Sequence, residues 1–375
     1  MEILNLILEN WRLKLIKDRY LILSDGSTFG GVGFGHNKEV VGEVVFNTSM
    51  TGYQEMLTDP SYGGQILTST YPMIGNYGTY KNTNESDSIQ VLSYLIRDLC
   101  EEPFHYENEE TLDSFLKNNN IPGIHSIDTR SLARKIRNKG ALIGLVTNNN
   151  NIEMALNKIN KFGKYENYNY VKEVSTPIKK FFKSEVSTFS VAVIDFGVKK
   201  NIIRLLNERD CDVTVYPWDH NFDDIGSHNY NGILLSPGPG DPSLINKQSE
   251  KLITLVTKIP TLAICLGHQI LAKAFGAGTF KLPFGHRGAN QPVKDLKTKK
   301  IYPTAQNHGF AVDSINFPSE LEVTHINLND NTISGFRHKE NPIISIQYHS
   351  EACPGPVDSE YIFDEFINLM KGKNA

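Results

Sequence analysis

Cys265 stands at the junction of two patterns in the sequence. The residues before it, 261–264, are apolar or small and predict a buried strand, whereas residues 267–276 have the spacing of a helix. A cysteine on such a sharp turn exposes its sulfur, and the first N–H groups and the dipole of the helix favour its thiolate. The position indicates a nucleophile. The alternative is a small hydrophobic side chain that ends a core strand.

A second group of candidates follows a buried-looking strand at residues 343–348. His349 and Glu351 are two residues apart, and in an extended chain such residues point the same way. Glu351 can then accept the imidazole Nδ1–H, and His349 can take the proton of Cys265. The three residues predict acyl transfer through a thioester. For His349 and Glu351 alone, a solvated loop is the alternative.

The third candidate is the segment SPGPGDP, which follows a predicted strand. It holds Gly238 and Gly240 between prolines in a rigid, open backbone. Their N–H groups, together with that of Leu266, predict a site for an oxyanion. A plain turn is the alternative, but a turn explains one glycine better than the whole run.

The elements that must position these groups alternate along residues 190–375. Strand patterns lie at 190–197, 211–218, 232–240, 261–265, 301–303, 321–325 and 343–348, and helix patterns at 199–209, 251–259, 267–276 and 361–370. This alternation predicts βαβ units and a doubly wound parallel sheet that is covered on both faces. Ligands bind at the carboxyl ends of the strands in such sheets, which is where all three groups of candidates stand.

Residues 1–150 predict a separate, mixed α/β domain. An Asp-Gly pair at residues 25–26 predicts a hairpin, and residues 128–141 predict a helix with Asp128 as its N-cap and Gly140 at its end. Residues 151–189 are polar and aperiodic, and we interpret them as a linker to the C-terminal domain, 190–375.

The segment GGVGFGHNK, residues 30–38, resembles a phosphate-binding loop. The Walker spacing requires a lysine after the second glycine of the motif, but His36 follows Gly35. The segment therefore predicts a glycine-rich turn, and we expect no nucleotide site in this chain.

Composition excludes several other classes of protein. The 375 residues carry a net charge of −4, which indicates neither a nucleic-acid partner nor an anionic membrane surface. The four cysteines form no CxxC pair, so we expect no disulfide framework, no metal site and a reducing compartment. No apolar run reaches about 18 residues, and the first 23 residues lack the features of a signal or transit peptide.

At these motifs the chain resembles the class I, or triad, glutamine amidotransferases. Their three motifs appear here as AICLGHQ, SPGPGDP and HSE, in the family's order. The resemblance implies a flavodoxin-like sheet and a glutaminase. Cys265 would attack the side-chain amide of glutamine, His349 would protonate the departing ammonia, and water would release glutamate from a thioester.

The N-terminal half resembles the small chain of carbamoyl-phosphate synthetase, over residues 42–78 and 124–141, and residues 284–295 and 304–313 fit the same family. The resemblance implies a large partner chain, in a heterodimer or a higher assembly, that uses ATP, Mg and bicarbonate. This chain itself would hold no cofactor. The product would be carbamoyl phosphate for arginine and pyrimidine synthesis, in a bacterial cytoplasm or a plastid stroma.

The resemblance also implies a set of residues that contact glutamine. They would be Ser61, Gly238, Gly240, Leu266, Gln269, Asn307, Gly309 and Phe310. Hydroxyl, amide and backbone groups of this kind suit the carboxylate and ammonium of an amino acid. Ser61 would come from the N-terminal domain, which would place the glutamine site at the domain interface.

The chain departs from the usual small-chain motifs at Pro237, Tyr348 and Ser350, where asparagine, glycine and proline are usual. Three alternatives remain open on the sequence. The chain could serve another synthase, such as the anthranilate type, or it could be a regulatory module that has lost its activity. It could also be a free-standing cysteine hydrolase that acts on other amides.

Overall fold

The computed structural model describes residues 17–245 and 249–372. Most of the N-terminal stretch in which we expected no signal or transit peptide lies outside these residues. Contacts divide the chain into two compact units. The first takes the residues up to 57 together with 64–84 and 91–167, and the second takes 58–63, 85–90 and 168 onward.

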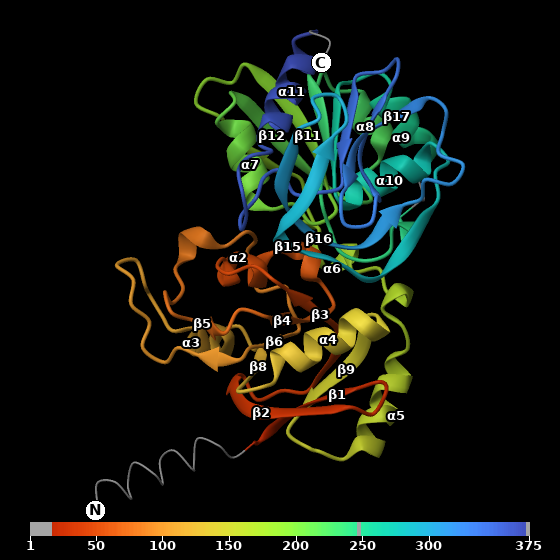
Figure 1. The fold of residues 1–375 in the computed structure, drawn as a ribbon. Helices are drawn as coiled ribbons and strands as arrows, with labels where there is room; N and C mark the ends of the chain where they lie inside the picture. Colours follow the sequence, from red (N-terminus) through yellow and green to blue (C-terminus); the bar gives the residue numbers. More distant parts are fainter. Residues whose placement is uncertain (1–16, 246–248, 373–375) are drawn as a thin grey trace, which may run out of the picture. The chain divides into compact units, whose positions relative to one another are not determined.

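The first unit is built on a closed barrel of strands in the order β1-β2-β8-β6-β4-β3-β9 (Figure 1). These strands are β1 (Arg19–Leu23), β2 (Thr28–Gly35), β3 (Val40–Asn47), β4 (Gln65–Ser69), β6 (Ser93–Leu95), β8 (Pro122–His125) and β9 (Leu142–Thr147). The predicted hairpin is confirmed, because β1 and β2 pair antiparallel around the Asp-Gly turn. Two short strands, β5 (Met73–Ile74) and β7 (Asp98–Leu99), pair with each other outside the barrel.

Three longer helices accompany this barrel: α3 (Leu112–Asn118), α4 (Thr129–Lys139) and α5 (Ile152–Phe162); a shorter one, α2, spans Tyr53–Thr58. The predicted ends of α4 are confirmed. The Asp128 side chain accepts a hydrogen bond from Ser131 N at 2.9 Å, and Gly140 follows the last turn with φ +90°. Thr129, Leu132 and Ile136 bury one face of this helix.

The prediction of a glycine-rich turn at residues 30–38 was wrong, because residues 28–35 form strand β2. Its glycines allow close packing between strands. A Cβ on Gly31 would lie 2.3 Å from the carbonyl oxygen of His125, and one on Gly33 would lie 2.9 Å from the Arg19 guanidinium. The segment is therefore extended where we expected it to fold back.

Regular elements also occur in the segment that we interpreted as an aperiodic linker. Helix α5 begins at the N-cap Asn151, whose side chain accepts from Met154 N at 2.9 Å. Its residues Ala155 and Ile159 pack against Ile22 and Leu145 of the barrel. A short helix, α6 (Val171–Val174), and strand β10 (Lys180–Phe182) follow in the second unit.

The second unit contains a sheet that has ten strands among the described residues, in the order β10-β12-β11-β13-β14-β19-β18-β16-β15-β17. Its further strands are β11 (Phe189–Asp195), β12 (Cys211–Pro217), β13 (Gly232–Leu235), β14 (Thr261–Ile264), β15 (Thr279–Asp295), β16 (Ile301–Val312), β17 (Leu321–Asn327), β18 (Ile333–His338) and β19 (Ile343–Ile346). The run β12-β11-β13-β14-β19 is parallel, as the alternation predicted.

The remaining strands of this sheet were not all expected. β10 pairs antiparallel at one edge, and β18, β16, β15 and β17 extend the other edge antiparallel. β15 and β16 are long strands that pair with two register shifts. Glycine and proline inside them weaken the alternation that would mark a strand in the sequence. The sheet is therefore mixed, with a parallel centre.

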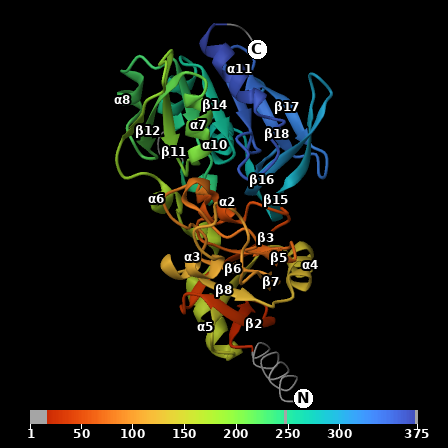
Figure 2. The same ribbon diagram turned by 90° about the vertical axis from the view of Figure 1, so that its left-hand side faces the viewer.

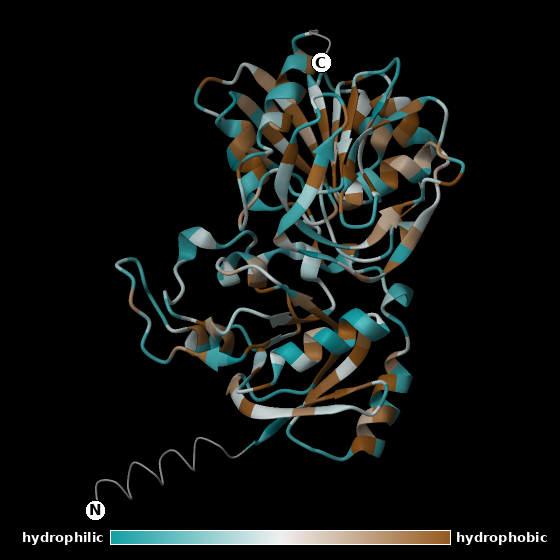
Figure 3. Ribbon diagram, viewed as in Figure 1, coloured by the Kyte–Doolittle hydropathy of each residue, from teal (hydrophilic) through white to brown (hydrophobic). Residues whose placement is uncertain are grey.

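Helices cover both faces of the parallel strands (Figure 1 and Figure 2). They are α7 (Lys200–Asn207), α8 (Phe222–Gly226), α9 (Ser249–Val256), α10 (Leu266–Ala274) and α11 (Tyr361–Met370). Alternate residues of β11 show the two faces: Val191 and Val193 pack with α7 and α11, whereas Ala192 and Ile194 pack with α8, α9 and α10. Figure 3 shows the corresponding hydrophobic colour along the central strands.

This is the doubly wound, flavodoxin-like arrangement that we expected. It brings the ends of β11, β13, β14 and β19, with the residues that follow them, to one edge of the sheet. Within the described ranges, no helix is both long enough and apolar enough to cross a membrane. All four cysteines lie in these ranges, and none of them is part of a disulfide there.

Candidate active site

Cys265 lies between the end of β14 and the first residue of α10, as the sequence predicted. Its backbone has φ +54° and ψ −105°, a conformation that costs a non-glycine residue about 1–3 kcal/mol. Two contacts hold the turn: Cys265 N donates to Ile346 O at 2.9 Å, and Gly267 N donates to Ser236 O at 3.1 Å. The side chain is buried, with its Sγ 3.8 Å from Asn307 O. The fold therefore maintains a strained elbow at the candidate nucleophile.

His349 and Glu351 are brought together, but by a turn. β19 ends at Ile346, and Ala352 N donates to His349 O at 3.2 Å, so residues 349–352 fold back. The extended geometry that we assumed for this pair was therefore wrong. The His349 Nδ1 nevertheless lies 2.6 Å from Glu351 Oε1, and both side chains are buried.

The charges of this pair are strongly coupled. Burial lowers the pKa of His349, but Glu351 and then Cys265 outweigh burial and raise it to about 10. Burial raises the pKa of Glu351, but Lys199 and His349 hold it at about 2. His349 Nε2 has no hydrogen-bond partner among the described residues. An imidazolium hydrogen-bonded to a carboxylate therefore has its second nitrogen available beside a thiol.

Lys199 is a member of this cluster that the sequence analysis missed. Its Nζ lies 3.2 Å from Glu351 Oε1, the oxygen that also contacts His349, and donates to Ala352 O. Its side chain is 2% exposed. Burial lowers the pKa of Lys199, but Glu351 and other acidic groups raise it above the ordinary value. A buried ammonium thus shares one carboxylate oxygen with the imidazole.

A turn at the carboxyl end of β11 places Lys199. The Asp195 carboxylate accepts from Gly197 N at 2.9 Å and from Val198 N at 2.7 Å, so it shapes the chain just before Lys199. The signal for Lys199 was present, because a lysine followed a buried strand at the edge that carries the other candidates. The sequence pattern placed Lys199 at the start of an amphipathic helix and gave it no role in the site.

The glycine loop after β13 lies against the cysteine elbow. A Cβ on Gly238 would lie 2.1 Å from Phe196 O and 3.0 Å from Leu266 Cδ2, so only glycine fits there. Gly240 has φ +94°, in the left-handed region. Since the first residues of a helix have no intrahelical acceptor for their N–H groups, Leu266 adds an amide at this place. These are the amides in which we expected an oxyanion site.

Four other predicted contacts meet on α10 and β16. Gln269 Nε2 donates to Phe310 O at 2.7 Å and to Gln347 Oε1 at 3.0 Å. Asn307 and Gly309 lie on the same strand as Phe310, and the Asn307 carbonyl oxygen is the one 3.8 Å from Cys265 Sγ. The buried Asn307 Oδ1 has no hydrogen-bond partner among the described residues. A polar ligand at this place would supply one.

Ser61 groups with the unit that holds Cys265, whereas we expected it from the other domain. Asp59, a second residue that we missed, connects it to the site: its Oδ1 accepts from Ser61 N at 2.8 Å and its Oδ2 from Asn307 Nδ2 at 3.1 Å. Ser61 Oγ is buried, and no described group bonds to it. A Cβ on Gly63 would lie 3.1 Å from Pro239. The segment 58–63 therefore packs against the glycine loop.

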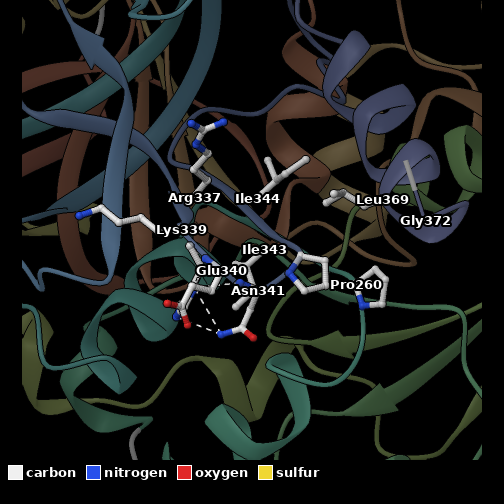
Figure 4. A pocket seen from close by; sticks show the side chains of 11 residues that line it. Pro260, Arg337, Lys339, Glu340, Asn341, Ile343, Ile344, Leu369 and Gly372 are labelled. Carbon is white, nitrogen blue, oxygen red and sulfur yellow. Dashed lines mark hydrogen bonds between the residues drawn. The ribbon is translucent and has the colours of Figure 1, made fainter. Parts of the chain in front are cut away.

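A pocket of about 520 Å³ at the opposite end of the sheet contains none of the candidate residues. It is lined by Pro260 and Pro342, which precede β14 and β19, and by Arg337, Glu340 and Asn341 (Figure 4). The candidate site lies at the other ends of the same two strands. Within the described ranges, no group of three or more His, Cys, Asp or Glu side chains is arranged to hold a metal ion.

Two family models match the chain, one to each half. The model for "Glutamine amidotransferase class-I" matches residues 192–369, and that for "Carbamoyl-phosphate synthase small chain, CPSase domain" matches residues 21–146. Most of the sheet, the cysteine elbow and the His–Glu pair thus lie in a class I glutamine amidotransferase domain.

Curated relatives extend this likeness over nearly the whole chain. The carbamoyl phosphate synthase small chains of Staphylococcus epidermidis, Clostridium perfringens and Listeria monocytogenes are each 47% identical to it. The matches cover 95%, 92% and 95% of this chain and 97%, 98% and 97% of the relatives. The chain belongs to the carbamoyl phosphate synthase small chain family, which confirms the resemblance found in the sequence.

Proposed function

We propose that this chain is the glutaminase subunit of a carbamoyl-phosphate synthetase. It would hydrolyse glutamine at Cys265 and supply ammonia to a large chain, which would use ATP, Mg and bicarbonate to make carbamoyl phosphate. The observation that carries the proposal is the buried contact of 2.6 Å between His349 Nδ1 and Glu351 Oε1, next to a cysteine on a strained elbow. Family membership supplies the substrate class.

The proposed reaction begins with the Cys265 thiolate, which the neighbouring imidazolium of His349 favours. The sulfur attacks the side-chain carbonyl carbon of glutamine, and the carbonyl oxygen becomes an oxyanion. Amides of the glycine loop and of Leu266 stabilise that charge. The C–N bond then breaks, His349 donates its proton to the leaving nitrogen, and ammonia departs from a γ-glutamyl thioester.

Hydrolysis of the thioester completes the cycle. His349, now neutral, takes a proton from water as the water oxygen attacks the thioester carbon. The C–S bond breaks, and glutamate and the thiolate are released. The balance is one glutamine and one water converted to one glutamate and one ammonia. Glu351 remains ionised throughout and keeps the imidazole oriented, as the third member of a triad does.

The glutamine molecule, side chain included, would be held by the eight residues inferred from the resemblance. The buried, unpartnered Ser61 Oγ and Asn307 Oδ1 support this assignment, because each would gain a hydrogen bond from the ligand. We further propose that the chain works with the large chain as a heterodimer or a higher assembly. It would hold no cofactor of its own and would serve arginine and pyrimidine synthesis in a bacterial cytoplasm or a plastid stroma.

The test is glutamate release from glutamine by the purified chain, alone and with a carbamoyl-phosphate synthetase large chain, ATP, Mg and bicarbonate. Slow release that rises sharply in the full mixture is expected. A rate of glutamate release that does not change when the large chain is added would point to another synthase, such as the anthranilate type. No release in either mixture would favour an inactive module.

The variant Cys265→Ser separates the two half-reactions. Glutamine-dependent carbamoyl phosphate synthesis should be abolished, whereas ammonia-dependent synthesis by the same complex should survive. Loss of both activities would contradict the division of labour between the chains.

A further inference from the structure

The first N–H groups of helix α7 are capped by a residue that is distant in the sequence. Lys199 occupies its N-cap position but makes no side-chain capping bond. Glu85 supplies the missing acceptors: its carbonyl oxygen accepts from Lys200 N at 2.8 Å, and its Oε2 accepts from Asn201 N at 3.0 Å. A carboxylate at a helix N-terminus is also favoured by the helix dipole. Glu85 therefore determines where α7 begins.

Glu85 is itself held firmly. Glu85 is 1% exposed, and its backbone N–H donates to Thr58 Oγ1 at 2.9 Å. Its Oε1 forms an ion pair with Arg204 Nη2 at 2.5 Å, and Arg204 Nε also donates to Asn201 Oδ1 at 2.9 Å. These contacts join Glu85 to the first turn of the helix from two sides.

The start of α7 in turn holds the candidate triad. Lys199 contacts Glu351 Oε1 and Ala352 O, and Asn201 Nδ2 donates to Glu351 O. The main chain and the carboxylate of Glu351 are thus both fixed by residues on either side of Lys200. Ala352 has φ +54°, a strained value that needs such support.

We propose that Glu85 is a positioning residue for the glutaminase reaction. By fixing the first turn of α7 it fixes Lys199 and Asn201, and through them the carboxylate that orients His349. The hydrogen bonds and the ion pair of Glu85 described above involve neither the cysteine nor the glutamine-binding residues, and its charge also favours the ammonium of Lys199. The inference rests on the glutaminase function proposed above.

Glu85→Ala is the main test, measured as glutamate release by the full chain. We expect kcat to fall about 10- to 100-fold and KM to change less than about threefold. The alkaline limb of the pH profile should move to lower pH, because a loosened carboxylate no longer raises the pKa of His349 fully. Rates are expressed per active site, which is counted with an electrophilic glutamine analogue. A variant that only reduced the fraction of folded protein would then leave both kcat per active site and the alkaline limb of the pH profile unchanged.

Two further variants sharpen the result. Glu85→Gln keeps an oxygen that can accept from Asn201 N and should retain most of the activity. Arg204→Met removes the ion pair and one contact of Asn201 but leaves the capping carboxylate, so its loss of kcat should be smaller than that of Glu85→Ala. If Glu85→Ala does not fold, Glu85→Asp replaces it, since the shorter side chain withdraws the carboxylate and should lower kcat in the same direction.

Two results would overturn the inference. One is a folded Glu85→Ala, or the Glu85→Asp that replaces it, with unchanged kcat and an unmoved alkaline limb of the pH profile. The other is a loss of kcat in Arg204→Met as large as that in Glu85→Ala, which would assign the effect to the ion pair. In both cases the wild type still releases glutamate. A wild type that releases none would instead refute the proposed function.

Discussion

Removal of the Lys199 ammonium is the perturbation whose size follows most directly from the structure. Glu351 is fully buried, and its pKa is held at about 2, whereas its ordinary value is 4.5. That difference corresponds to about 3 kcal/mol in favour of the carboxylate. Among the causes that lower this pKa, the charge of Lys199 is the largest, ahead of the charge and the hydrogen bond of His349. Removing one partner of a buried ion pair costs about 3–5 kcal/mol, so we expect Lys199→Met to cost about 3 kcal/mol.

The pH dependence of this loss has a definite sign. A depressed carboxyl pKa stabilises the folded state above the unfolded pKa of about 4.5, and that stability disappears as the pH falls towards 2. The difference between the wild type and Lys199→Met should therefore be complete at pH 7. At pH 3 it should be less than half as large.

Chemical unfolding followed by circular dichroism, at pH 7 and at pH 3, measures both quantities. Lys200→Met is the matched control, because the neighbouring Lys200 forms an exposed ion pair with Asp87 at 2.9 Å. That variant should change the unfolding free energy by less than about 1 kcal/mol. Equal stability of Lys199→Met and the wild type at pH 7, or a loss that is the same at both pH values, would refute the reasoning.

Three further variants test other contacts of the site. Gly238→Ala would place a Cβ 2.1 Å from a carbonyl oxygen, so glutaminase activity should fall at least about 100-fold in a steady-state assay; activity within threefold of the wild type would contradict this. Asp59→Ala removes the carboxylate that holds Asn307, and the KM for glutamine should rise about 10-fold or more with a smaller change in kcat. Glu351→Gln removes the charge that raises the pKa of His349 to about 10. The imidazolium, normally lost only towards pH 10, should then be lost at lower pH, and the alkaline limb of the activity profile should move down; an unmoved limb would show that another group controls it.

Local patterns predicted the parts of the site that depend on short stretches of chain. The strand before Cys265 and the helix after it were visible as hydrophobic periodicity, and these two elements are what strain the elbow. The pairing of His349 with Glu351 was also expected, although for a wrong geometric reason. A turn and an extended chain can both bring residues two apart together, and the sequence alone did not distinguish them.

Contacts between distant parts of the sequence could not be predicted in the same way. Lys199 and Asp59 lie 152 and 292 residues before Glu351, and although Lys199 follows a predicted strand, no local pattern connects either residue to its partner in the site. Their roles arise only when the sheet places β11 beside the later strands and when residues 58–63 pack on the glycine loop. The charges of Lys199 and Asp59 matter to the site because the side chains are buried, and burial depends on how the whole chain folds.

Helix α5 is a different case, because its signal was present but weak. Asn151 is a good N-cap, but it ends a run of asparagines that we interpreted as part of the linker. Only Ala155 and Ile159 of the helix are buried, so its apolar face is narrow. In a polar, asparagine-rich segment, such a short run of helix-spaced apolar residues does not distinguish a helix from a loop.

The grouping of residues 58–63 and 85–90 with the later part of the chain has a practical consequence. A fragment starting at residue 190 would contain Cys265, His349 and Glu351, yet it would lack the carboxylate that holds Asn307 and the one that starts α7. It would also lack Thr176, whose N–H donates to Asp195 at 2.7 Å. The amidotransferase part of this protein is therefore discontinuous in sequence, and a truncation chosen from motif positions alone would remove pieces of its own active site.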